Sequence, residues 1–235
     1  AEWMPSRTDV AWFCPEIIAD NPARAFVIEG GEPYTGRIGG PDMFGVEWVY
    51  VPVAGGSMEK PGAKPLLDDA NDWPEVIKFP DIDALNWAEC KELNSCLNES
   101  TRSFHVTFQN GIFERLISFM DFEGAAMALI DEEQQDAVKD FFEQLSDMYI
   151  KMIDCAIKAF PEIDIFYIHD DWGSQKETFF SPSIAEEMIV PYMRRVTDYL
   201  HSRGKFCELH SCGNNYKQVA NYIKAGWDAW APQLM

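Results

Sequence analysis

Two short stretches decide the fold class of this chain: IDIFYIH at residues 163–169 and FCELHSCG at residues 206–213. Each is typical of a β-strand. Between them Ser181 and Pro182 form a good helix N-cap and first-turn pair, and apolar residues then recur at helical spacing. A further helix and a strand over 227–233 follow. The order strand–helix–strand–helix–strand predicts parallel β/α units.

The regular pattern begins near residue 101, with a strand predicted at 103–108 and a helix at 131–160. Residues 1–100 are rich in proline, glycine and tryptophan and are only weakly periodic, which favours pocket-wall loops. We expect one incomplete (β/α) barrel domain over 1–235. A (β/α)8 barrel and an open doubly wound sheet both fit the pattern. Because the sequence stops directly after a strand, we expect the closing units of a longer barrel to be absent.

Composition excludes several classes of partner. The 235 residues include 19 Lys and Arg against 39 Asp and Glu, a net charge of −20. So negative a surface repels phosphate backbones, which argues against a nucleic-acid partner. The sequence has no run of 18 apolar residues and no signal peptide at its start, so we expect a cytoplasmic protein without membrane contact.

The octapeptide at 206–213 suits a metal. If it is extended, Glu208, His210 and Cys212 point to one side. A carboxylate, an imidazole and a thiol on one face are ligands for a borderline-soft divalent ion, with zinc the first candidate. The alternative is a buried polar strand end with an inert cysteine.

In either fold the loops that follow the strands share one edge of the sheet. Polar residues collect at these strand ends. We predict that His169 and Asp171 are catalytic. We also expect substrate contacts from Asn110, Asp170, Trp172, Gln175 and Gln233.

Some of these residues also have structural interpretations. Asp170 and Asp171 can be helix-start or loop carboxylates, and His169 can be a hydrogen-bonded core histidine. His105 lies within a strand, where a core position is favoured. His201, near a helix C-terminus beside Arg203, is assigned a structural role.

Several motifs in order resemble the uroporphyrinogen decarboxylase superfamily. They are Asp42-Met43-Phe44-Gly45-Val46, the Phe79-Pro80-Asp81 turn, Asp170 to Gln175, Ser181-Pro182 and His210-Ser211-Cys212-Gly213. The resemblance extends from about Asp42 to Gln233 and implies a (β/α)8 barrel longer than this chain.

The superfamily contains decarboxylases and corrinoid-dependent methyltransferases. A His-x-Cys pair with a later cysteine forms the zinc set of the methyltransferase branch, and His210 and Cys212 match this pair. The resemblance places the third ligand beyond Met235, with Glu208 as a substitute. The decarboxylase's N-terminal Arg-Gln-Ala-Gly-Arg sequence is absent. The opening Glu2-Trp3-Met4-Pro5, with residues 50–56, resembles the first methyltransferase of anaerobic phenyl methyl ether O-demethylase systems.

This resemblance implies transfer of a methyl group from a small methylated substrate, such as a methoxylated aromatic, to the Co(I) of a corrinoid (cobalamin) carried by a partner protein. Zinc would stabilise the leaving oxygen. The alternatives are a uroporphyrinogen decarboxylase-like lyase and a non-catalytic metal- or corrinoid-binding barrel. The lyase would need arginines at its pocket mouth, for which Arg24, Arg37 and Arg102 are the available sources.

Overall fold

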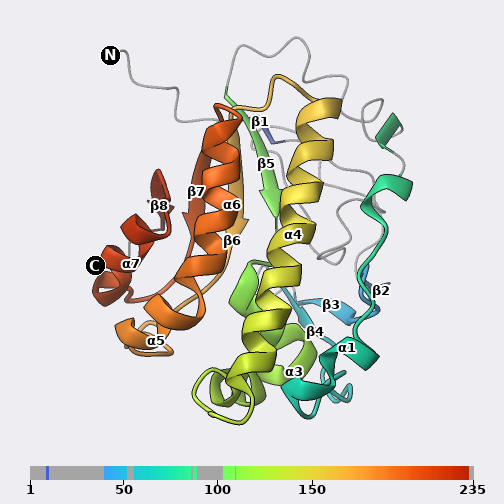
Figure 1. Ribbon diagram of the computed structural model, residues 1–235, viewed down its shortest axis with the longest axis vertical. Coiled ribbons are helices and arrows are strands. Elements are labelled where there is room, and N and C mark those ends of the chain that lie inside the picture. Colours follow the sequence, from blue (N-terminus) through green and yellow to red (C-terminus); the bar gives the residue numbers. More distant parts are fainter. Residues whose placement is uncertain are drawn as a thin grey trace.

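The computed structural model describes residues 9–10, 40–51, 56–85, 87–88, 103–108 and 110–232. Its centre is a parallel five-stranded sheet in the order β1-β5-β6-β7-β8 (Figure 1). The strands are β1 (Asp9–Val10), β5 (Phe104–Phe108), β6 (Ile165–His169), β7 (Phe206–His210) and β8 (Ala229–Ala231). The chain is thus an α/β protein, as the order of elements predicts.

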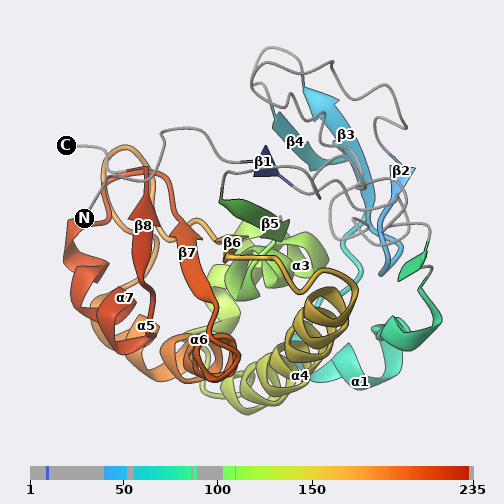
Figure 2. The same ribbon diagram turned by 90° about the horizontal axis from the view of Figure 1, so that it is seen from above.

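Helices connect the strands and lie along one side of the sheet (Figure 2). They are α3 (Ile112–Ala128), α4 (Gln135–Ala159), α5 (Pro182–Met188), α6 (Val190–Ser202) and α7 (Val219–Lys224), the last preceded by the 3-10 turn η4 (Tyr216–Gln218). In Figure 1 strands β5, β6 and β7 point downward, while α4 and α6 return upward. The carboxyl ends of these strands therefore meet at one edge.

Local sequence explains where two of the helices begin. The hydroxyl of Ser181 accepts the N–H of Ile184 at 3.3 Å and caps α5. Pro191 falls inside the helical pattern that follows Ser181, where a proline predicts a kink in one long helix. Instead the helix divides at Ile189, and Pro191 occupies the first turn of α6, where its missing N–H costs nothing.

A second, antiparallel sheet joins β2 (Gly40–Pro41), β3 (Glu47–Val51) and β4 (Gly56–Glu59). Short helical turns follow: η1 (Ala70–Asp72), α1 (Trp73–Val76) and η2 (Ile82–Ala84). The sequence pattern predicts a short strand at residues 46–53, which corresponds to β3, but it does not predict β4. It also predicts a strand at residues 10–14, of which only Val10 lies among the described residues.

The sequence pattern predicts a helix that follows Gly111 and ends near Met120, whereas α3 continues to Ala128. It does so through a break at Asp121, whose φ of 67° and ψ of 176° are non-helical. The Asp121 carboxylate accepts the N–H of Gly124 at 2.9 Å and so caps the second half. Among the described residues, no helix combines the length and hydrophobicity needed to cross a membrane.

Candidate metal centre

The two faces of the parallel sheet differ in polarity. The face under the helices is fully apolar and buried, with Val106, Phe108, Phe166, Ile168, Cys207 and Leu209. In the strand register, Tyr167 pairs with Glu208 and His169 pairs with His210. Because side chains alternate along a strand, these four share the other face. His169 and His210 are the last residues of β6 and β7, so the polar face ends in two neighbouring imidazoles.

His210 is oriented by contacts at both ring nitrogens. Its Nδ1 forms a hydrogen bond with the Tyr167 hydroxyl, and its Nε2 lies 3.2 Å from Cys212 Sγ. Its ring also stacks on His169, with centroids 4.2 Å apart and planes inclined by 14°. A partner on one nitrogen fixes the ring and leaves the other to coordinate. Nε2 of His210 is therefore the ring nitrogen that could coordinate a metal, together with the Cys212 thiol.

A carboxylate completes the cluster. Potential ligand atoms of His169, Asp171 and His210 all lie within 4.8 Å of one another. Asp171 Oδ1 accepts the backbone N–H of Cys212 at 2.6 Å, and the Cys212 thiol meets the cluster through its 3.2 Å contact with His210 Nε2. Nitrogen, sulfur and oxygen donors thus converge at the carboxyl edge of the sheet. This donor set suits zinc.

Glu114, a residue that sequence analysis does not select, supports His169 from the first turn of α3. Its Oε2 lies 2.6 Å from His169 Nδ1, and both side chains are largely shielded from solvent. A carboxylate at Nδ1 fixes the orientation of the ring and its tautomer, which directs Nε2 away from Glu114. The only sequence feature that points to Glu114 is that it is an acidic residue in the first helical turn after the end of a strand.

Asp170, predicted to bind substrate, makes structural hydrogen bonds inside the protein. It is fully buried; Oδ1 accepts the N–H of Glu114 at 2.9 Å and Oδ2 accepts the indole N–H of Trp172 at 2.8 Å. Burial, followed by the nearby Glu114 carboxylate, raises the pKa of Asp170 to about 7. A Cβ on Gly111 would lie 2.4 Å from the Asp170 Cβ, so glycine is required for this approach. Asp170 fixes the start of α3 and does not reach the open side.

The loop after β7 is fixed by Ser211. Its hydroxyl accepts the backbone N–H of Trp172 at 2.9 Å, and its carbonyl accepts the indole N–H of Trp230 at 2.9 Å. Asn215 Nδ2 donates to the Ser211 hydroxyl at 3.1 Å and to the Cys212 carbonyl at 2.5 Å. These hydrogen bonds fix the backbone on both sides of Ser211, at His210 and at Cys212.

The remaining predicted residues lie in different environments. Trp172 is fully buried against Phe180 and Tyr222, so in this conformation it belongs to the core and not to a substrate pocket. Gln175 is exposed, and Gln233 lies outside the described residues. Asn110 is buried, and its carbonyl accepts the Tyr149 hydroxyl at 2.6 Å.

Glu208 shares the polar face but is not in the three-residue cluster. It is half-buried, and this burial raises the pKa of its carboxyl group. The structure favours Asp171 over Glu208 as the third donor, because Asp171 directly contacts the Cys212 backbone. His105 is buried, and burial lowers its pKa, consistent with a neutral core histidine.

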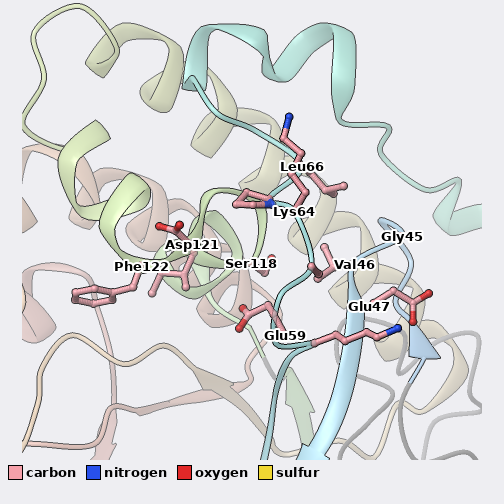
Figure 3. Close-up of a pocket in the computed structure, with 13 residues that line it drawn as sticks. Gly45, Val46, Glu47, Glu59, Lys64, Leu66, Ser118, Asp121 and Phe122 are labelled. Carbon is pink, nitrogen blue, oxygen red and sulfur yellow. The ribbon is translucent and has the colours of Figure 1, made fainter.

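A pocket of about 390 Å³ lies elsewhere, between the β3–β4 hairpin, residues 60–66 and the break in α3 (Figure 3). Its lining includes Glu47, Glu59, Lys64, Asp121 and Phe122. None of the residues predicted to bind substrate or metal lines it. The pocket and the cluster at the sheet edge are separate features.

Neither the protein-family models nor the curated proteins contain a match to this chain. The superfamily resemblance and its functional implications therefore stay predictions from sequence.

Proposed function

We propose that this chain is the zinc-binding, substrate-activating part of a methyltransferase that passes the methyl group of a methyl ether to the Co(I) of a corrinoid protein. The observation that carries this proposal is the cluster of His169, Asp171 and His210 at the carboxyl edge of a parallel sheet, with Cys212 Sγ 3.2 Å from His210 Nε2. That edge is where parallel α/β folds place their chemistry.

We further propose that the parallel sheet is part of a (β/α)8 barrel of the uroporphyrinogen decarboxylase type. Two features support this. The helices lie along one side of the strands (Figure 2), and the opposite face carries polar side chains that suit a barrel interior lined by a site.

In this proposal His210, Cys212 and Asp171 would hold zinc. Asp171 takes the place of Glu208, the third ligand suggested by the sequence. When bound, zinc supplies a Lewis acid that stabilises negative charge on the ether oxygen. The reaction breaks the methyl–oxygen bond, whose electron pair stays on oxygen, while the Co(I) electron pair forms the new bond to the methyl carbon. The product alcohol needs one proton.

His169 is the proton donor in the proposed site. Its Nδ1 faces the Glu114 carboxylate at 2.6 Å, which favours the charged ring, and its stacking on His210 brings it next to the ligand set. The proton passes from His169 Nε2 to the leaving oxygen. Glu114 acts through His169 and is a positioning residue.

The lyase alternative receives no support from the described arginines. Arg115 is fully buried in an ion pair with Asp42 and cannot line a pocket mouth. Arg24, Arg37 and Arg102 lie outside the described residues. The third alternative, a non-catalytic barrel, would bind the same ligands without turnover.

The test is methyl transfer under anoxic conditions, with the full-length gene product, zinc, chemically reduced cob(I)alamin or its corrinoid protein, and a panel of methoxylated aromatics. Absorbance reports the methylated corrinoid. We expect formation with one donor, loss in His210→Ala and Cys212→Ala, and unchanged rates in Cys155→Ala, a cysteine of α4 away from the cluster. No methyl transfer with a competent partner would exclude the proposal, and porphyrinogen decarboxylation would then be assayed.

A further inference from the structure

A second group of metal-ligating side chains lies at the opposite end of β7. Cys207 is the second residue of that strand, His201 lies in the last turn of α6, and Asp228 immediately precedes β8. Cys207 and His210 are three residues apart, so their side chains point to opposite faces and are separated by about 10 Å along the strand. The two clusters cannot share an ion.

The three side chains converge on one point. His201 Nε2 lies 3.0 Å from Asp228 Oδ2 and 3.6 Å from Cys207 Sγ, and the sulfur lies 3.3 Å from the same carboxylate oxygen. Donors around tetrahedral zinc, with Zn–S near 2.3 Å and Zn–N and Zn–O near 2.0–2.2 Å, lie roughly 3.3–3.6 Å apart. The observed triangle has nearly these edges.

The geometry does not fit a nucleophilic triad. In such a triad the acid and the nucleophile bond to different nitrogens of the imidazole, so that the ring relays a proton. Here the carboxylate and the sulfur both approach Nε2 of His201. Cys207 is also fully buried, so a substrate cannot reach its sulfur.

The backbone sets the triangle in place. The N–H of Cys207 donates to Asp228 Oδ2 at 2.8 Å, and the N–H of Asp228 donates to the Cys207 carbonyl at 3.0 Å. The side chains of His201 and Asp228 remain 38% and 34% exposed. The cluster is therefore open to solvent on the side of His201 and Asp228, with the Cys207 sulfur on its buried side.

We propose that His201, Cys207 and Asp228 form a second site for a divalent, borderline-soft metal ion, with Zn²⁺ the best-suited class. Bound there, the ion connects the end of α6 to the starts of β7 and β8. It is a structural site, on the edge of the sheet opposite the candidate metal centre. The assignment is independent of the proposed methyl transfer.

Zinc content and cobalt spectra test the assignment. In a His210→Ala/Cys212→Ser variant we expect one remaining equivalent of zinc and, with Co²⁺, a cobalt–thiolate charge-transfer band from Cys207. Adding His201→Ala, at an exposed helix end, should lower zinc affinity by at least about a hundredfold. Loss of a residue that only supports a ligand costs at most about that much. Adding Cys207→Ser should abolish the band.

The matched control is Cys155→Ala in the same background, which should keep both the zinc and the band. A folded His210→Ala/Cys212→Ser chain without zinc or without the thiolate band would overturn the second site. So would full zinc retention after His201→Ala. Because these readouts need no substrate, inactivity in methyl transfer leaves them interpretable.

Discussion

Arg115 of α3 and Asp42, in the turn before β3, form an ion pair in which both side chains are completely buried and the charged atoms are 2.5 Å apart. The Asp42 carboxylate also accepts the indole N–H of Trp48 and the backbone N–H groups of Phe44 and Val46. The pair joins the antiparallel hairpin to the helix that begins at the candidate metal centre.

Breaking this pair should strongly destabilise the chain. Arg115→Met leaves a buried carboxylate without its cation, and Asp42→Asn leaves a buried guanidinium, so each should lower the free energy of unfolding by about 3–5 kcal/mol. Denaturant unfolding measures the loss, and the double variant should lose less than the sum of the two. Additive losses would show that the two charges are not coupled. Glu177→Gln, which breaks the exposed pair with Lys217, is the control and should leave the midpoint unchanged.

Asp170 should make stability depend on pH. Its pKa is about 7 in the folded chain against an ordinary 3.8, so between these values the folded chain keeps a proton that the unfolded chain has lost. The contribution of Asp170 to stability is therefore complete below pH 3.8 and is lost as the pH rises toward 7, with a slope of up to about 1.4 kcal/mol per pH unit. Denaturant unfolding of the chelator-treated chain between pH 4 and 8 should show this slope, and Asp170→Asn should remove it. Equal slopes in both proteins would contradict the assignment.

The break in α3 should respond oppositely to two substitutions of Asp121. Its positive φ is a strained conformation for a residue with a Cβ, while its carboxylate caps Gly124. Asp121→Gly removes the strain and loses only a few tenths of a kcal/mol of capping, so stability should rise by about 1 kcal/mol. Asp121→Ala keeps the strain and loses the cap, so stability should fall by about 1 kcal/mol. Thermal or denaturant unfolding measures both changes in stability. If both variants were less stable than the parent chain, backbone strain at Asp121 would be unimportant.

Glu114→Gln tests the positioning of His169. The neutral amide is a weaker acceptor for the Nδ1–H of His169 and holds the ring less firmly, so methyl transfer should slow by roughly ten- to a hundredfold. Zinc content should stay unchanged, because Glu114 is not among the proposed ligands. A wild-type rate in this variant would show that Glu114 does not position His169 for the proposed proton transfer.

The sequence predicts the β/α order well because its signals are local. Ser181 and Pro182 mark a helix start, and alternation along β7 brings His210 and Cys212 to one side of the chain. The different environments of Asp170 and Asp171 are not local. One carboxylate turns into the core beneath α3 and the other turns to the Cys212 backbone, and no pattern in the sequence separates the two neighbours.

Contacts between distant segments also escape sequence analysis. Glu114 meets His169 across 55 positions, and the meeting depends on how the first turn of α3 packs on the end of β6. Likewise, His201 and Cys207 look structural in isolation. They become a candidate site only when the turn before β8 brings Asp228 onto them.

The hydrogen bonds around Ser211 have a practical consequence for work with the purified protein. Since the backbone between His210 and Cys212 is held by hydrogen bonds from Trp172, Trp230 and Asn215, we expect this loop to keep its shape when metal is removed. Under the proposed function, a preparation stripped of zinc at this centre would give a normal circular dichroism spectrum and elute normally, yet be inert in the methyl-transfer assay. Metal analysis, and not proof of folding, is the measurement that separates active from inactive material.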